Sequence, residues 1–79
     1  MSSKIYSKRY QIFLKKLRSA RKNAGMTQKQ AAHALLKPQS FISKCENGER
    51  RVDVIDLIDF ANLYQKPIVF FYEGVNGNE

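Results

Sequence analysis

A short stretch of the sequence carries four polar side chains that would share one face of an α-helix. They are Gln39, Ser40, Ser43 and Lys44. With about 3.6 residues per turn, Ile42 and Cys45 fall on the opposite, inward side of that helix. A glutamine amide can pair with adenine through two hydrogen bonds, a lysine ammonium favours guanine, and a serine hydroxyl tolerates either base. The stretch therefore has the chemistry needed to read base edges in a DNA groove.

Residues that would carry catalysis or bind a cofactor are too few to form a site. The chain has one histidine, His33, and one cysteine, Cys45, whereas a metal site needs several such ligands close together. The sequence contains no nucleophile–histidine motif and no glycine-rich phosphate-binding loop. It therefore predicts no enzymatic activity, no metal and no cofactor.

Charge is distributed unevenly along the 79 residues. Residues 1–45 contain eleven lysines and arginines and no acid, whereas residues 46–79 contain three basic and seven acidic residues. This polarity predicts one basic surface, which is typical of a protein that binds a polyanion such as nucleic acid. A basic surface that merely keeps the protein in solution is the alternative.

Apolar residues recur at intervals of three and four, which predicts an all-α fold of five short helices. Thr27 and Gln30 have the spacing of a capping box at the start of the second helix. Asp53 can cap the fourth helix, and Pro38 and Pro67 suit the starts of the third and fifth. The predicted helices cover residues 7–24, 28–36, 39–47, 54–65 and 67–73.

One domain accounts for nearly the whole chain. It is predicted over residues 7–74, between a flexible arm at residues 1–6 and a C-terminal tail at residues 75–79. The longest apolar run has five residues and is too short to span a bilayer, and the first six residues lack an apolar signal segment. A lone cysteine suits a reducing compartment. We therefore expect a cytoplasmic protein.

The second and third predicted helices have the pattern of a helix-turn-helix. About three residues separate them, and Ala31 and Ala32 are small enough to let the helices cross closely. In this motif the second helix enters the major groove while the first crosses the DNA backbone. The pattern predicts a recognition helix at residues 39–47, with Arg50 near a phosphate where the chain leaves the groove.

Six short segments, each a weak signal by itself, form a strong signal when they occur together in this order. They are Leu17-Arg18-Ser19-Ala20-Arg21, Gly25-Met26-Thr27-Gln28, Ala31-Ala32, Ile42-Ser43, Glu46-Asn47-Gly48-Glu49-Arg50 and Leu57-Ile58-Asp59-Phe60-Ala61. With these segments the chain resembles the Cro and phage-repressor (Xre-like) family of helix-turn-helix proteins from about Leu17 to Gly74. The resemblance implies a five-helix, sequence-specific regulator of transcription that binds double-stranded DNA.

The resemblance also implies roles for individual residues. It places base contacts at Gln39, Ser40 and Lys44 on the outer face of the third helix, and Ser43, which shares that face, is expected to join them. It places Gln28 against a phosphate, and further phosphate contacts are expected at Thr27, Lys37, Asn47 and Arg50. Arg21 is expected to pair with Glu46 inside the domain.

The chain departs from the family pattern at two positions. Leu36 occupies the turn between the second and third helices, where the family usually has glycine, so the turn is expected to differ. Ala31 stands where leucine is common, which leaves room that either Phe41 or Leu36 would fill.

Three consecutive aromatic residues near the C-terminus predict an interface between two copies of the chain. A small core has little room for all of them, so the predicted interface comprises Ile58, Phe70 and Phe71. Capping of the core by these aromatics is the alternative. A homodimer would fit a pseudo-palindromic operator.

Two other functions remain open at this point. A protein-interaction module, such as an antitoxin-like or antirepressor adaptor, would use the same fold but would place acidic or apolar residues on the outer face of the third helix. RNA binding relies on exposed aromatic rings, for which only Phe41 is a candidate on that face. For the DNA-binding reading, the resemblance suggests a phage-type repressor, a controller of a restriction–modification operon or an antitoxin.

Overall fold

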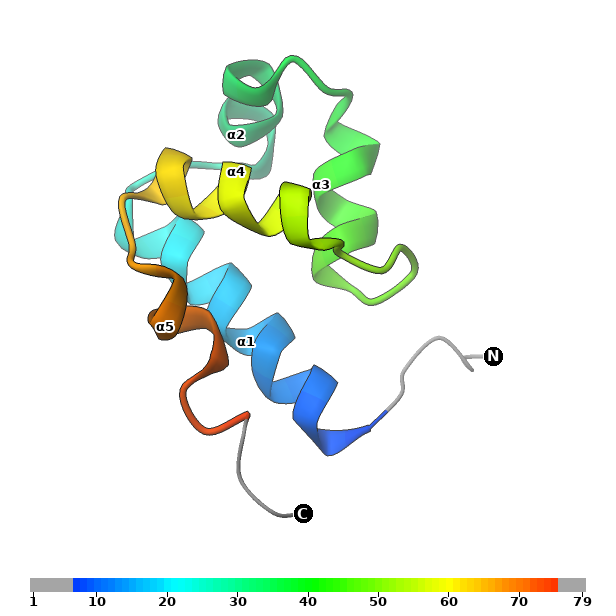
Figure 1. The fold of residues 1–79 in the computed structure, drawn as a ribbon. Helices are drawn as coiled ribbons and strands as arrows, with labels where there is room; N and C mark the ends of the chain where they lie inside the picture. The colour runs from blue at the N-terminus through cyan, green and yellow to red at the C-terminus, as the bar shows by residue number, and fades with distance from the viewer. Residues whose placement is uncertain (1–6, 76–79) are drawn as a thin grey trace.

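A computed structural model describes residues 7–75, which form five α-helices and no strand (Figure 1). The helices are α1 (Lys8–Asn23), α2 (Gln28–Leu35), α3 (Gln39–Glu46), α4 (Val54–Tyr64) and α5 (Ile68–Tyr72). The all-α prediction is confirmed, and both the first and the last residue of each helix lie within about one residue of the predicted limits. The arm predicted at residues 1–6 and residues 76–79 of the predicted tail lie outside the described part. No helix within residues 7–75 is both long enough and apolar enough to cross a membrane.

Reciprocal side-chain caps fix the starts of two helices. Thr27 Oγ1 accepts a hydrogen bond from the backbone N–H of Gln30 at 3.0 Å, and Gln30 Oε1 accepts one from the N–H of Thr27 at 2.9 Å. Asp53 and Asp56 form the equivalent box at α4. Each box satisfies amides that the first turn of a helix leaves unpaired. The sequence therefore sets where α2 and α4 begin.

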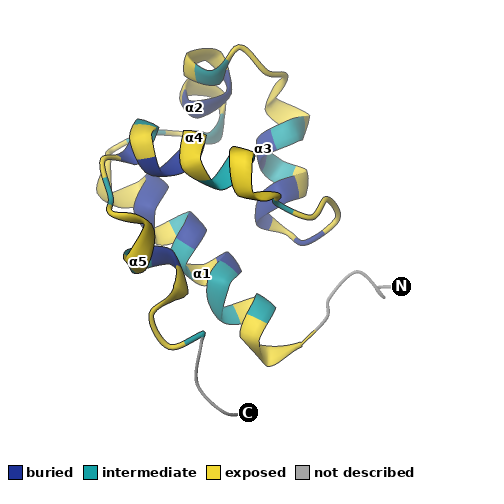
Figure 2. Ribbon diagram, in the orientation of Figure 1, coloured by how far each residue is buried: buried dark blue, intermediate teal, exposed yellow. Residues whose placement is uncertain are grey.

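The core lies among the five helices, with α1 packed on α3, α4 and α5, and α2 packed on α3 and α4; Figure 2 shows the buried stretches on the inner sides of the helices. Ala31 and Ala32 are buried where α2 packs against α3, as their small size predicts. The other fully buried or nearly buried apolar residues are Leu14, Leu17, Ala20, Ile42, Cys45, Phe60, Ala61, Tyr64 and Phe71. The helix-turn-helix is thereby supported by α1, which packs on α3, and by α4, which packs on α2.

Phe71 corrects part of the predicted subunit interface. Its side chain is 0% exposed and its ring packs on Phe13 of α1, with centroids 6.5 Å apart. A side chain that is fully enclosed within one protomer cannot contact a second. Phe71 thus caps the core, whereas Phe70 is half-buried and Ile58 is exposed. The short α5 buries one ring of its three because only one side of it faces α1.

The turn before α3 has an unusual backbone at Leu36. This residue adopts the left-handed conformation, with φ 59° and ψ 43°, and its side chain is 89% exposed. The Leu36 side chain therefore does not fill the space beside Ala31, whereas Phe41, the other candidate, is half-buried and packs against the core. Glycine adopts this conformation without the steric cost that a Cβ brings.

Leu36→Gly is expected to raise the free energy of unfolding by about 0.5–1 kcal/mol. Relief of the left-handed strain outweighs the extra freedom that glycine gives the unfolded chain, because the exposed leucine side chain contributes little packing. Urea melts measure the change. Leu36→Ala keeps the Cβ and is the matched control, so an equal gain in both variants would show that strain is not the cause.

Candidate nucleic-acid interface

The outer face of α3 presents the four side chains that the sequence assigns to base contacts. Gln39, Ser40 and Lys44 are exposed, and Ser43 is half-buried beside them. On the inner side, Ile42 and Cys45 are completely buried. Burial of the inner side fixes the rotation of α3 about its axis, so that amide, hydroxyl and ammonium groups face outward.

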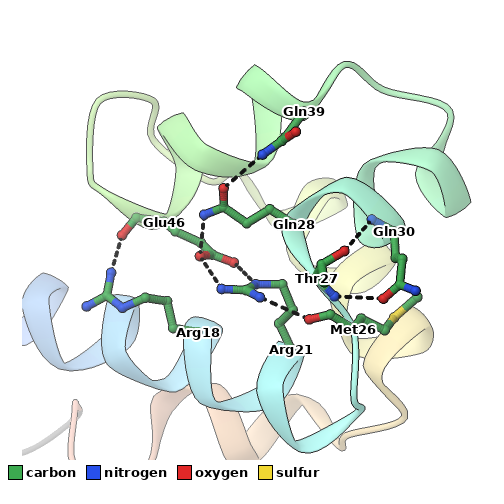
Figure 3. Close-up of polar contacts among 8 residues, drawn as sticks. All are labelled: Arg18, Arg21, Met26, Thr27, Gln28, Gln30, Gln39 and Glu46. Carbon is green, nitrogen blue, oxygen red and sulfur yellow. Dashed lines mark hydrogen bonds and ion pairs between the residues drawn. The ribbon is translucent and has the colours of Figure 1, made fainter.

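Glu46 joins the end of α3 to α1 through three hydrogen bonds (Figure 3). Arg21 donates from Nε to Oε2 at 2.7 Å and from Nη2 to Oε1 at 3.1 Å. Arg18 donates from Nη1 to the backbone carbonyl oxygen of Glu46 at 2.6 Å. The expected pair of Arg21 and Glu46 is therefore in contact, and its two-pronged geometry fixes orientation as well as distance.

The same carboxylate also reaches α2. Gln28 donates from Nε2 to Glu46 Oε1 at 3.1 Å, and its own Oε1 accepts a weak hydrogen bond from Gln39 Nε2 at 3.5 Å. Gln28, which is expected at a phosphate, thus also orients the first residue of α3. Sequence reasoning missed this second role, because it depends on how closely α2 and α3 approach.

Burial of Glu46 removes its negative charge from the outer face of α3. The side chains of Arg21 and Glu46 are only 10% and 3% exposed. The hydrogen bond with Glu46 raises the pKa of the Arg21 guanidinium above its usual value, so Arg21 stays charged and compensates the acid. The outer face of α3 is left with the positive charge of Lys44.

The residues expected at phosphates lie around α3. Thr27 is exposed at the start of α2, Lys37 is exposed in the turn before α3, and Asn47 is exposed just after it. Asn47 Oδ1 accepts a hydrogen bond from the backbone N–H of Glu49 at 3.2 Å. Arg50 follows, with Nη2 at 3.2 Å from Asp56 Oδ2. Their exposure leaves these groups available to a DNA backbone beside α3.

Phe41 does not offer a free ring for base stacking. It is half-buried, and its ring stacks on Phe60 of the core with centroids 6.2 Å apart and planes 20° apart. This packing weakens the RNA-binding alternative, which needs exposed aromatic faces.

Cys45 is a core residue in α3. Burial raises the pKa of its thiol from 9.0 to about 11. The folded protein therefore holds the thiol proton more tightly than the unfolded chain does. Within residues 7–75, no three His, Cys, Asp or Glu side chains lie close enough together to bind a metal ion.

Alkaline pH is expected to destabilise the protein through Cys45. Below pH 9 the thiol is protonated in both states, and between about pH 9 and 11 only the unfolded chain loses the proton, so the free energy of unfolding falls by up to about 2 kcal/mol. Urea melts from pH 8 to about 9.5 measure the slope below the range in which Tyr64, whose pKa is also raised by burial, would add to it, and Cys45→Ala should flatten it there. Rapid thiol labelling of the native protein at pH 8 would contradict the burial.

Comparison with known proteins agrees with this geometry. The model of the helix-turn-helix family matches residues 17–71. Among solved structures, an XRE-family like protein from Pseudomonas syringae pv. tomato str. DC3000 is similar with a TM-score of 0.76 and 45% identity, over 85% of this chain and 82% of that chain. A search of curated proteins finds no significant match. The chain therefore belongs to the Cro and phage-repressor (Xre-like) family of helix-turn-helix DNA-binding regulators.

Proposed function

We propose that the protein is a cytoplasmic transcriptional regulator that binds one sequence of double-stranded DNA, with α3 in the major groove. The observation that carries the proposal is the outer face of α3, where exposed hydrogen-bonding side chains stand on a helix whose inner side is fully buried. Such a helix can enter the major groove as a rigid unit and present these side chains to the base edges.

Electrostatics supports the same function. The acid of α3, Glu46, is paired inside the domain, while Lys37, Lys44 and Arg50 are exposed along the helix and at its ends. Cations at the rim of a groove-reading helix meet phosphates, which fix its position without reading sequence. An adaptor that binds another protein would instead place apolar or acidic groups on this face.

Gln39→Ala and Lys44→Ala are each expected to weaken binding to the preferred duplex by about 1–3 kcal/mol and to relax selectivity at one or two base pairs. Their amide and ammonium groups face outward from α3 and can reach base edges. The preferred sequence is first selected from random duplexes, and affinities are then measured by fluorescence anisotropy on the selected and scrambled duplexes.

Arg50→Ala is the contrasting variant in this experiment. It should weaken both duplexes alike and reduce the slope of log affinity against log salt concentration by about one unit, because it removes a phosphate contact. An unchanged ratio of selected to scrambled affinity in Gln39→Ala and Lys44→Ala would show that α3 does not read the sequence. The protein-interaction function would then be preferred.

We further propose that the protein acts as a homodimer through the exposed apolar surface of α4 and α5. This surface includes Ile55 and Ile58 on α4, which are 64% and 41% exposed, and Val69 on α5, which is 42% exposed. A domain of this size gains stability by burying such a surface. A twofold axis through it would present two copies of α3 to the half-sites of a pseudo-palindromic operator.

A further inference from the structure

We infer that Phe41 is a positioning residue for DNA binding, which acts by holding Lys37 and Arg50 beside the groove-reading face of α3. The inference rests on the proposed function and adds a residue to it that is not expected to touch DNA. It concerns the edge of α3 opposite to the Glu46 network.

The place of Phe41 on α3 gives it access to both sides of the helix. Successive residues turn by about 100°, so Phe41 falls between outward Lys44 and buried Cys45. Glu46 falls at the other border, beside Gln39. One border of the reading face is therefore fixed by the hydrogen bonds of Glu46, and Phe41 occupies the equivalent place on the other.

Two cations from opposite ends of α3 meet at the Phe41 ring. Lys37 Nζ, from the turn before α3, lies 5.0 Å from the ring centroid. Arg50 Cζ, from the segment after α3, lies 4.8 Å from it. Both distances are within the range of cation–π attraction. The ring itself stacks on Phe60 of the core.

Arg50 is also held by contacts other than the Phe41 ring. Its Nη2 lies 3.2 Å from Asp56 Oδ2, and its backbone N–H donates to the carbonyl oxygen of Lys44 at 3.1 Å. The carboxylate and the ring thus both hold the guanidinium. Because long cationic side chains lose entropy when a phosphate orders them, confinement before binding favours the complex on any sequence.

Phe41→Leu tests the inference, since it keeps an apolar side chain but removes the aromatic face. We expect affinity for the selected and scrambled duplexes, each of about 20 base pairs, to fall alike by about three- to tenfold. The slope of log affinity against log salt should stay close to that of the wild type, because the variant removes neither cationic charge. Lys37→Gln and Arg50→Gln should each cost less affinity in the Phe41→Leu background than in the wild type. Phe41→Tyr should restore wild-type binding.

Phe13→Leu is the matched control, because Phe13 is also a half-buried ring, packed on Tyr10 and Phe71 away from α3. It should lose comparable stability in urea melts without losing affinity. Wild-type affinity for both duplexes in folded Phe41→Leu, or a loss confined to the selected duplex, would overturn the inference. In the free protein, NMR should show ring-current shifts of the Lys37 and Arg50 side-chain protons that vanish in Phe41→Leu; their absence would also overturn it. Failure of the wild type to bind either duplex would instead overturn the proposed function.

Discussion

Glu46→Gln is expected to lower the free energy of unfolding by about 3–5 kcal/mol at neutral pH. The substitution keeps an oxygen that can accept from Arg21 but removes the charge that compensates the guanidinium. The Arg21 side chain is 10% exposed and donates to both carboxylate oxygens. Water therefore has little access to the guanidinium and cannot compensate its positive charge once the carboxylate is gone. Thermal and urea melts measure the loss.

Glu73→Gln provides the matched control for this change. Glu73 Oε1 lies 4.0 Å from Lys16 Nζ; the Glu73 side chain is 61% exposed and the Lys16 side chain is half-buried, at 30%. An exposed pair contributes less than about 1 kcal/mol, because solvent screens it and two side chains lose freedom in forming it. Equal losses in Glu46→Gln and Glu73→Gln would contradict a special role for the buried pair.

The helices were predictable because their signals are local. Thr27 and Gln30 mark the start of α2 within a few residues of sequence, and the apolar spacing from Leu57 to Tyr64 places one face of α4 against the core. The outer face of α3 followed from helical period alone, since Ile42 and Cys45 must point inward. Such features need no knowledge of how the helices pack.

Features that depend on packing were not predictable in the same way. In α5 three aromatic residues follow one another, so periodicity does not say which ring turns inward; the position of α1 decides that it is Phe71. The cluster of Lys37, Phe41 and Arg50 depends on the path of the segment after α3. The resemblance to a family supplied the pair of Arg21 and Glu46, whose members lie 25 residues apart.

Phe71→Ala is expected to destabilise the protomer by about 3–5 kcal/mol, which is the usual loss when a buried phenylalanine leaves a cavity. Its ring is fully enclosed and contacts Phe13 and Phe70, with centroids 6.5 Å and 5.3 Å away. Small domains have only about 5–15 kcal/mol of stability, so the variant should be partly unfolded well below the melting temperature of the wild type. Circular dichroism during heating measures the shift.

Ile58→Asp distinguishes this core effect from dissociation of the proposed dimer. Ile58 is 41% exposed on α4, so the substitution should leave the fold of each protomer intact while a charge prevents the apolar surfaces from meeting. Analytical ultracentrifugation should then show a folded monomer for Ile58→Asp and a dimer for the wild type at tens of micromolar. That concentration corresponds to a free energy of association of about −6 to −7 kcal/mol. A Phe71→Ala variant that melts like the wild type but sediments as a monomer would place the ring between subunits. That result would contradict the packing of the ring against α1. A wild-type protein that is itself monomeric would exclude the dimer and leave the core role of Phe71 unchanged.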